Sequence, residues 1–245
     1  MTAVAWTHAF IDVPRDRVDA AKAFWAAVTG WEPGPPWAGH PEFVSLAPSD
    51  GGTPYLHVQA VDAAPRVHLD IAGDLDRQSE RLAELGAHRG QRHDGWQVLS
   101  SPAGLPFCVC PDRPPYKRPA AVRWPGGHRS RLVQLCVDVS AARADDDCTF
   151  WRAATGWADE LVDAPEFRRL AHRVESPPQL LVQRVDEDRS TSAGAHLDLG
   201  TDDIPAEVAR LQALGARVLW PGRGFTALED PTGLPFCVTG IDPDR

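Results

Sequence analysis

The sequence predicts an α+β fold made of two tandem copies of one domain, and each copy is expected to contain two βαβββ modules. Three observations predict it: a long internal repeat, the alternation of apolar and polar residues that is typical of strands, and amphipathic segments that end at glycine. The offset between the copies stays between 124 and 129 residues. The repeated strings, with their positions in the first and the second copy, are FW (24–25, 150–151), TGW (29–31, 155–157), PEF (41–43, 165–167), HLD (68–70, 196–198), LGA (85–87, 214–216) and GLPFCV (104–109, 233–238).

The length of the repeat indicates whole domains, because the units of solenoid proteins are only about 20–50 residues long. We therefore expect a first domain at residues 1–112 and a second at residues 131–245, joined by a linker at residues 113–130 that is rich in proline and arginine. The stretch from Pro111 to Arg131 has little hydrophobic periodicity. Because proline-rich linkers tend to be extended and semi-rigid, this linker is expected to hold the domains in a preferred relation.

The first module of each copy is expected to contain a strand, a helix and further strands. The leading strands are rich in β-branched residues, and the helices are amphipathic. Each helix is expected to end at a Thr-Gly-Trp string, where Gly30 and Gly156 can supply a left-handed C-cap. The predicted elements are strands at residues 4–13, 43–47 and 54–61 with a helix at 17–28 in the first copy, and strands at 132–139, 167–172 and 179–185 with a helix at 145–154 in the second.

The second module of each copy is expected to repeat this order. An apolar strand is followed by an amphipathic helix that again ends at glycine. Two final strands flank a short turn, because proline and glycine near the end of each copy favour a hairpin. The predicted elements are strands at 67–71 and 195–199, helices at 75–85 and 204–214, and turns at 101–104 and 230–233.

The composition excludes several classes of protein. The chain has 245 residues, of which 43% are hydrophobic and 24% charged, as in ordinary globular proteins. We expect it to be cytoplasmic, because it has no apolar run near the roughly 20 residues of a membrane span and no signal peptide at its start. Five cysteines suit a reducing compartment. The net charge of −9 disfavours nucleic acid as a partner. We expect no membrane partner, and the chain is expected to be a monomer or a homodimer.

The repeated βαβββ unit, with a short helix after the first strand and Asp-Pro-Thr-Gly before the last, resembles the vicinal oxygen chelate superfamily. That superfamily includes glyoxalase I, bleomycin-resistance proteins, fosfomycin-resistance enzymes and extradiol dioxygenases. The resemblance covers nearly the whole chain outside the linker. It implies two tandem domains whose curved mixed sheets each enclose a ligand-binding cleft.

Side chains alternate across a strand, so the polar residues of the leading strands share one face. The resemblance implies that this face lines the concave side of the sheet. The residues expected in the first cleft are His8, Phe10, Asp12, His57, His68, Asp70, Cys108 and Cys110. Those expected in the second are Gln134, Cys136, Asp138, Gln183, His196, Asp198 and Cys237.

In metal-dependent relatives, the resemblance implies ligands on four strands: His or Gln on the first, an acid on the fourth, His on the fifth and Glu on the last. His8 or Gln134 matches the first position, and His68 or His196 matches the third. Both acids are missing from both copies: the fourth strand offers His57 and Gln59, or Leu181 and Gln183, and the last offers Cys108 or Cys237.

The metal site is therefore predicted to be incomplete, and no cofactor is expected. A divalent metal at His8 and His68 stays open, with His57 and Cys108 completing a zinc-like set. The alternative is that His68 and His196 hydrogen-bond Asp70, Asp198 or the backbone. Cys108 and Cys237 are expected to act as small apolar side chains, with a nucleophilic role as the alternative.

Three functions follow from this interpretation. The first is the binding of a small organic molecule in a cleft, similar to resistance proteins that sequester antibiotics. The second is a metal-dependent lyase, isomerase or ring-cleaving dioxygenase that acts in the N-terminal half only. The third is acid–base catalysis by a pair such as His68 and Asp70. Whether the protein is an enzyme stays open, and no catalytic residue is assigned. The aromatic residues of the first-module helices, Phe24, Trp25, Trp31, Phe150, Trp151 and Trp157, are expected in the core.

Overall fold

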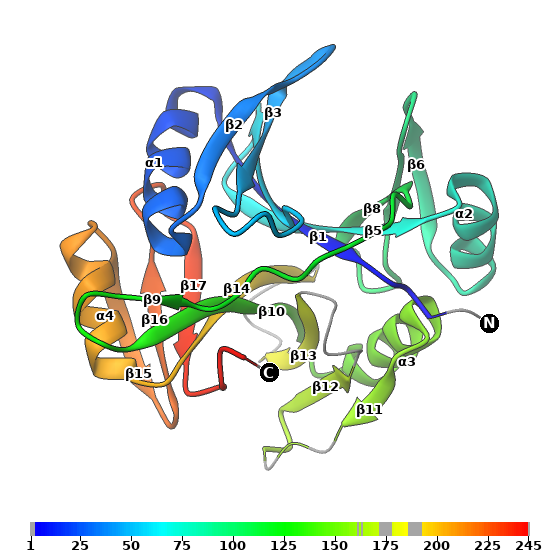
Figure 1. Cartoon of the computed structure of the whole chain (residues 1–245). Helices are drawn as coiled ribbons and strands as arrows, with labels where there is room; N and C mark the ends of the chain where they lie inside the picture. The colour runs from blue at the N-terminus through cyan, green and yellow to red at the C-terminus, as the bar shows by residue number, and fades with distance from the viewer. Residues whose placement is uncertain (1–2, 161, 163, 172–177, 186–192, 245) are drawn as a thin grey trace. The chain divides into compact units, whose positions relative to one another are not determined.

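The chain folds into two mixed β-sheets accompanied by a few helices (Figure 1). This computed structural model describes residues 3–160, 162, 164–171, 178–185 and 193–244. The predicted α+β fold class is confirmed. None of the helices in this described part is long and apolar enough to cross a lipid bilayer.

The first sheet has eight strands in the order β2-β3-β4-β1-β5-β8-β7-β6. Strands β5 and β8 run parallel, whereas pairs such as β3 with β4 and β7 with β8 are antiparallel. The strands are β1 (Thr7–Pro14), β2 (Glu32–Trp37), β3 (His40–Ala47), β4 (Leu56–Val61), β5 (Arg66–Gly73), β6 (His88–Arg92), β7 (Gln97–Ser100) and β8 (Pro106–Pro111).

The second sheet repeats this order as β11-β12-β13-β10-β14-β17-β16-β15, with β14 and β17 parallel. A short strand, β9, pairs with β10 beside this path. The strands are β9 (Val122–Arg123), β10 (Arg129–Ser140), β11 (Ala158–Glu160), β12 (Phe167–Ala171), β13 (Gln179–Val185), β14 (Gly194–Thr201), β15 (Arg217–Gly222), β16 (Phe225–Glu229) and β17 (Pro235–Thr239).

Every predicted strand is found within a few residues of its expected bounds, but residue 172 lies outside the described residues. The βαβββ modules require strands β2, β6, β11 and β15, but the sequence assigned no residue range to them, and all four are edge strands of the two sheets. Strand β2 contains Pro33, Pro35 and Pro36, which an edge tolerates because the missing N–H groups need no partner there. Strand β6 is exposed along its whole length and therefore has no apolar alternation. The hydrophobic pattern marks strands with a buried face, and these edges lack one.

The four predicted α-helices are present. They are α1 (Val18–Thr29), α2 (Leu75–Glu84), α3 (Ala144–Thr155) and α4 (Ile204–Ala213), and a 3₁₀ turn at Arg15–Arg17 precedes α1. The predicted left-handed C-caps are confirmed, since Gly30 has φ 67° and Gly156 has φ 70°. The helices therefore end where the Thr-Gly-Trp strings occur because glycine adopts a positive φ without a steric penalty.

The predicted turns join the last two strands of each copy. In the second copy, the Asp230 carboxylate Oδ1 accepts hydrogen bonds from the Thr232 and Leu234 N–H groups at 2.7 and 2.9 Å. A short strand lies within the predicted linker: β9 pairs with the start of β10, and Trp124 N–H donates to the His128 carbonyl at 2.9 Å.

The chain divides into two compact units, and each contains segments of both sequence copies. Unit 1 is Met1–Ala9, His68–Tyr116 and Leu135–Ala195, and unit 2 is Phe10–Val67, Lys117–Gln134 and His196–Arg245. A second module of one copy thus shares a unit with the first module of the other. The boundaries proposed for the sequence copies, 1–112, 113–130 and 131–245, follow the repeat and stay a prediction.

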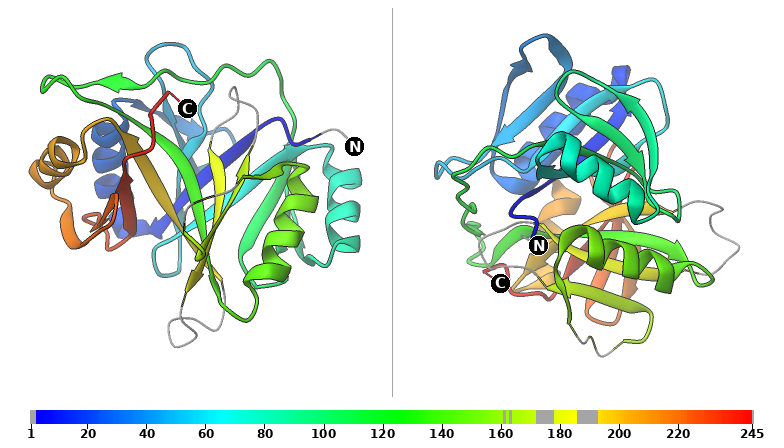
Figure 2. Two further views of the ribbon diagram at one scale, coloured as in Figure 1. Left: turned by 90° about the horizontal axis from the view of Figure 1, so that it is seen from below. Right: turned by 90° about the vertical axis from the view of Figure 1, so that its right-hand side faces the viewer.

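Each unit places two helices side by side (Figure 2). In unit 1, the Arg81 guanidinium on α2 donates to the carbonyls of Ala153 and Ala154 at the end of α3. In unit 2, Arg210 on α4 donates to the carbonyls of Ala27 and Val28 at the end of α1 at 3.0 and 2.9 Å. A cation at a helix C-terminus is favoured by the helix dipole and by the carbonyls that lack a partner within the helix.

The aromatic residues of α1 and α3 lie in the core, as predicted. Trp25 and Trp151 are fully buried, and the other four predicted core aromatics are at most 5% exposed. In unit 2, the rings of Trp25 and Phe236 lie 5.2 Å apart, and in unit 1 those of Trp151 and Phe107 lie 5.1 Å apart. Edge contacts of this kind add about 0.5–1.5 kcal/mol to the burial of the rings.

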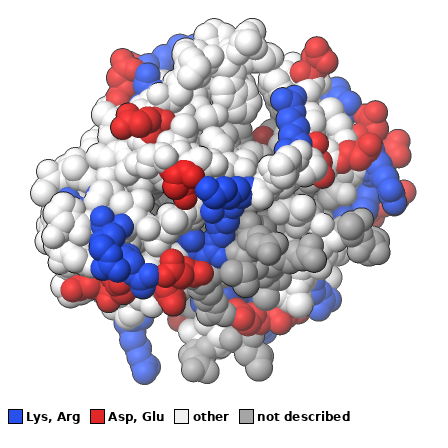
Figure 3. Space-filling view, in the orientation of Figure 1, with Lys and Arg blue, Asp and Glu red and all other residues white. Residues whose placement is uncertain are grey.

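Charged side chains of both signs are intermixed on the face drawn in Figure 3. Several form exposed ion pairs, such as Arg15 with Asp62 at 3.0 Å and Arg92 with Asp76 at 2.8 Å. Exposed pairs stabilise a protein by only about 0–1 kcal/mol each. The buried aromatic contacts therefore contribute more to the fold than the surface charges do.

Candidate functional site

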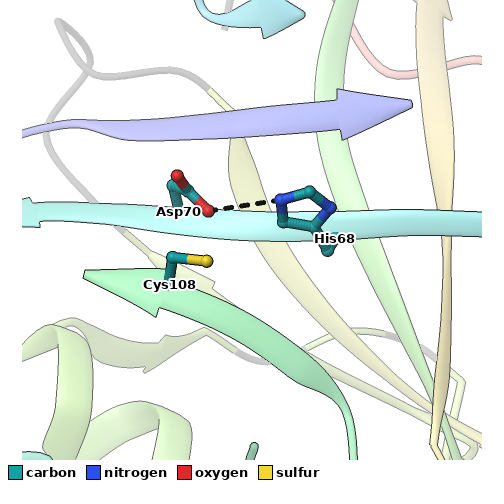
Figure 4. Close-up of side chains that lie close together, drawn as sticks. All are labelled: His68, Asp70 and Cys108. Carbon is teal, nitrogen blue, oxygen red and sulfur yellow. Dashed lines mark ion pairs between the residues drawn. The ribbon is translucent and has the colours of Figure 1, made fainter. Parts of the chain in front are cut away.

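Three side chains with metal-binding atoms converge on β5 and β8 (Figure 4). His68 and Asp70 are two residues apart on β5 and therefore share one of its faces. Cys108 on β8 is paired in parallel register with Asp70. The distance from His68 Nε2 to Asp70 Oδ1 is 3.5 Å, and one donor atom from each of the three residues lies within 4.8 Å of the others. We call this set the first triad.

The second copy builds an equivalent set from His196, Asp198 and Cys237, which we call the second triad. Asp198 on β14 is paired in parallel register with Cys237 on β17. His196 Nε2 lies 3.4 Å from Asp198 Oδ1, and the three donor atoms are again within 4.8 Å of one another. Each triad lies within a single unit, the first in unit 1 and the second in unit 2.

The first triad is the more deeply buried of the two. His68, Asp70 and Cys108 are 7%, 7% and 8% exposed, whereas His196 and Cys237 are half-buried. If the Asp70 carboxyl and the Cys108 thiol were both ionised, their negative charges would need a positive partner, because a buried charge is costly unless it is paired or bound to a cation. The imidazole beside the carboxylate offers such a partner, and a divalent cation would offer one as well.

The sequence left open a zinc-like set of His8, His57, His68 and Cys108, with the pairing of His68 and Asp70 as the alternative. Among the described residues, the group around His68 and Cys108 contains Asp70 in place of His8 and His57. His8 is half-buried on β1. His57 lies on β4, and its Nδ1 is 2.9 Å from the hydroxyl of Ser45 on the neighbouring strand β3. The physical reason is register, since β5 and β8 are hydrogen-bonded neighbours and bring Asp70 next to Cys108.

Phe10 and His57, both predicted site residues, belong to a cluster of rings in unit 2. They stack with centroids 4.6 Å apart. Trp37 stacks on Phe43 at 5.0 Å and meets Phe10 and His57 edge-on at 6.1 and 5.5 Å. Trp37 is 37% exposed, whereas the other three rings are buried. We call these four residues the aromatic cluster.

Sequence reasoning did not assign Trp37 and Phe43 to the site. Phe43 was visible as an aromatic residue in the repeated PEF string, but Trp37 lies in the proline-rich edge strand that had no predicted residue range. The second copy does not repeat the cluster, because Cys136 and Leu181 stand where the first has Phe10 and His57.

The remaining predicted residues are placed as follows. Asp12 is fully buried and accepts a 2.7 Å hydrogen bond from Arg66 Nε, which gives it an ion-pair partner. In the second copy, the Cys136 thiol lies 3.7 Å from Gln183 Oε1. Gln134 is fully buried, and Asp138 is half-buried near the end of β10.

We interpret Cys110 as a structural residue. Burial raises its pKa, and the neighbouring Asp70 carboxylate raises it further. Its Sγ lies 3.8 Å from the Ile71 carbonyl. Because the thiolate is the nucleophilic form, Cys110 remains an inert thiol at neutral pH.

Comparison with known proteins relates both copies to one family. The family model of the glyoxalase-like domain matches residues 8–110 and 134–239. No curated protein sequence matches the chain.

Among solved structures, the Mn(II)-bound glyoxalase from Novosphingobium aromaticivorans is 19% identical, with a TM-score of 0.69 over 100% of this chain and 86% of that one. The 2,3-dioxygenase LapB from Pseudomonas sp. KL28 is 12% identical, with a TM-score of 0.66 over 98% and 93%. The 2,2',3-trihydroxybiphenyl 1,2-dioxygenase from Sphingomonas wittichii strain RW1 is 11% identical, with a TM-score of 0.64 over 97% and 90%. Because these identities are low, the comparison with the three structures shows a shared fold and nothing more.

Proposed function

Because the chain belongs to the glyoxalase-like domain family, we propose that it binds a small organic molecule at the aromatic cluster of its first copy. The resemblance to the vicinal oxygen chelate superfamily, inferred above, is confirmed by the family match and by the shared fold. Since one fold supports many chemistries, the function has to be argued from the residues themselves. The aromatic cluster is the observation that carries the proposal.

The cluster has the composition of a small-molecule site. Such sites are lined mainly by apolar and aromatic side chains with a few polar groups that orient the ligand. Trp37 offers an exposed ring backed by the buried rings of Phe10 and Phe43. The Ser45 hydroxyl is the polar group, since Trp37 Nε1 donates to it at 2.9 Å and His57 Nδ1 lies 2.9 Å from it.

These contacts also hold the exposed ring in place. A side chain that is already ordered loses little entropy when a ligand binds, so more of the contact energy appears as affinity. The hydrogen bond from Trp37 to Ser45 and the stacking on Phe43 both restrict the indole. We therefore expect one site per chain, in the first copy, because the second has Cys136 and Leu181 at the equivalent positions.

Ligand titration of the Trp37→Ala variant tests this proposal. A matched pair of probes, 2-naphthol and its saturated analogue trans-2-decalol, separates ring stacking from plain hydrophobic binding. We expect 2-naphthol to bind at one equivalent per chain and Trp37→Ala to weaken it by at least about tenfold, which equals roughly 1.4 kcal/mol. The control is Trp220→Ala, which removes the other strongly exposed tryptophan, 49% exposed on an edge strand. Equal affinity of the wild type and Trp37→Ala for 2-naphthol contradicts the proposal.

A second candidate is a metal-dependent lyase, isomerase or dioxygenase that acts in the first copy. It is favoured by the first triad, whose nitrogen, oxygen and sulfur donors fit a divalent metal and leave a tetrahedral ion one open position. A metal held there would act as a Lewis acid on a substrate oxygen. His68, Asp70 and Cys108 would hold the metal, and burial would shield these side chains from bulk water.

Both copies contain a triad, so the triads do not explain why only the first copy would be an enzyme. The difference between the copies lies at His8 and His57, which the second copy replaces by Gln134 and Leu181. His8→Gln, which introduces the residue that the second copy carries as Gln134, tests the candidate. If the first copy is a metal-dependent enzyme, His8→Gln should abolish the turnover of a catechol or glutathione hemithioacetal probe. The melting temperature and the metal content should stay the same. Turnover that survives in His8→Gln removes the argument for a one-sided enzyme. Acid–base catalysis by His68 and Asp70 alone stays a prediction.

A further inference from the structure

We propose that the molecule bound at the aromatic cluster carries a carboxylate, and that Arg66 holds this carboxylate through the two Nη groups of its guanidinium. The inference rests on the proposed function, because it names the chemical class of the ligand for that same site. Asp12 is a positioning residue, since it touches Arg66 and not the ligand. The ligand is then an aromatic acid.

The guanidinium of Arg66 is held on one side and open on the other. Its Nε donates to Asp12 Oδ2 at 2.7 Å, and the Asp12 side chain is fully buried. In the described part of the chain, the Nη atoms of Arg66 make no hydrogen bond, and 51% of the side chain is exposed. A buried carboxylate therefore fixes the direction of a cation whose remaining donors face outward.

Strand geometry places this cation beside the aromatic cluster. Phe10 and Asp12 are two residues apart on β1, so they share a face and their Cα atoms are about 7 Å apart. Strand β1 lies between β4, which carries His57, and β5, which begins at Arg66. All of these residues belong to unit 2. A fused two-ring ligand is about as long as this spacing, so a ring that stacks in the cluster can direct a carboxylate at Arg66.

The donors of Arg66 suit a carboxylate in particular. A planar guanidinium offers parallel N–H groups that match the two oxygens of a carboxylate. The hydrogen bond to Asp12 uses one of its five N–H donors, and the four on the Nη atoms remain. Because the chain has a net charge of −9, an anionic ligand needs a local cation of this kind.

The second copy has neither part of this arrangement. Gly194 stands at the position of Arg66, and the aromatic cluster is not repeated. The aspartate is kept as Asp138, but it is half-buried, whereas Asp12 is fully buried. The arginine and the rings are therefore present together in one copy and missing together from the other, as expected for parts of one site.

Two ligands of the same shape test the inference by isothermal titration calorimetry: 2-naphthoate and its neutral amide, 2-naphthamide. We expect the wild type to bind 2-naphthoate at least about tenfold more tightly at neutral pH. Arg66→Gln keeps an N–H donor for Asp12 but removes the charged fork, so it should abolish this preference and leave the affinity for 2-naphthol within about twofold. Arg92→Gln is the matched control, because Arg92 is 44% exposed, is paired with Asp76 and lies in unit 1.

Arg66→Lys separates the fork from the charge and serves if Arg66→Gln misfolds, with the thermal midpoint as the fold control. It keeps a cation beside Asp12 but lacks coplanar donors, so the preference for 2-naphthoate should fall below about threefold.

Equal affinity of the wild type for 2-naphthoate and 2-naphthamide overturns the inference. So does a preference that survives in Arg66→Gln. Either result leaves the proposed function standing when Trp37→Ala still weakens the binding of 2-naphthol. Equal affinity of the wild type and Trp37→Ala for 2-naphthol contradicts the proposed function instead, so the two failures are distinguishable.

Discussion

The indole Nε1 of Trp25 donates a 2.9 Å hydrogen bond to Oδ2 of Asp230, which lies 205 residues further along the chain. Both residues are buried: Trp25 is fully enclosed and Asp230 is 3% exposed. The same carboxylate accepts hydrogen bonds from Thr232 and Leu234 through Oδ1 and so shapes the turn before β17. One side chain therefore joins α1 of the first copy to the last turn of the second.

Asp230→Ala should destabilise unit 2 by at least about 3 kcal/mol, because it leaves a buried indole N–H and several turn donors without their acceptor. Urea unfolding monitored by tryptophan fluorescence measures this loss. The exposed Asp94→Ala variant is the control, and a loss for Asp230→Ala no larger than that of the control would contradict the role of this carboxylate.

In unit 1, the buried indole N–H of Trp151 also donates to an aspartate, but this aspartate lies on the helix and not in the turn. Trp151 Nε1 donates to Oδ2 of Asp147 on its own helix at 2.8 Å, and Asp147 Oδ1 accepts from Ala103 N–H in the turn at 3.1 Å. By the repeat, Asp147 corresponds to Ala21, and Ser101 corresponds to Asp230. Burial raises the pKa of the Asp147 carboxyl, while hydrogen bonds from Ser101, Ala103 and Trp151 lower it in part.

The exchange predicts a rescue. Asp147→Ala should cost about 2–4 kcal/mol, and adding Ser101→Asp should restore at least half of it, because the carboxylate then approaches the indole from the turn. The unfolding free energies of both variants, measured in urea, decide the outcome. A double variant that is less stable than Asp147→Ala would show that the two positions are not interchangeable.

Acid should weaken the buried hydrogen bonds that join Glu207 on α4 to His128 and Ser130 in the linker. Burial alone would raise the pKa of Glu207, but hydrogen bonds and charge from Arg210, His128 and Ser130 lower it below 4.5. Because the folded-state pKa is the lower one, the stabilisation is complete well above pH 4.5 and is lost as pH falls through the folded value. Glu207→Gln should cost about 2–4 kcal/mol at neutral pH, and this cost should shrink as the pH falls below 4.5.

The measurement is urea unfolding of the wild type and Glu207→Gln at several pH values, with the exposed Glu84→Gln as the control for the substitution. A cost that stays constant or grows as the solution is acidified would contradict the predicted direction.

Two glycines of β14 should respond differently to alanine. A Cβ at Gly200 would lie 2.7 Å from the Ile241 carbonyl oxygen and 3.0 Å from Val133, whereas one at Gly194 would meet nothing within 4 Å. Gly200→Ala should therefore lose about 2 kcal/mol or more, and Gly194→Ala should be neutral or slightly stabilising. Thermal unfolding compares the two variants, and equal midpoints would contradict the predicted close approach at Gly200.

Much of the fold was predictable because its signals are local. The repeat, the four helices and the strands with a buried face follow from periodicity over a few turns or residues. The C-caps at Gly30 and Gly156 follow from the freedom of glycine to adopt a positive φ. The edge strands β2, β6, β11 and β15 gave no such signal, since an edge needs neither continuous N–H donors nor a buried face.

The candidate site was predictable in part. Alternation along β5 placed His68 and Asp70 on one face, and their pairing was one of the interpretations left open by the sequence, whereas the approach of Cys108 to Asp70 was not predicted. This approach depends on which strands are hydrogen-bonded neighbours and in which register, and neither is encoded within a single strand. Trp37 was missed for the same reason that its edge strand was missed.

The sequence by itself determined the family, the duplicated α+β fold and the chemistry available along each strand, because these depend on composition and on spacing within a segment. Only the tertiary structure decided that the compact units combine modules of different copies, that Trp25 finds its acceptor in Asp230, and that each copy assembles a histidine, an aspartate and a cysteine. These outcomes depend on long-range pairing, where the burial of apolar faces selects the partners and sheet register sets the distances.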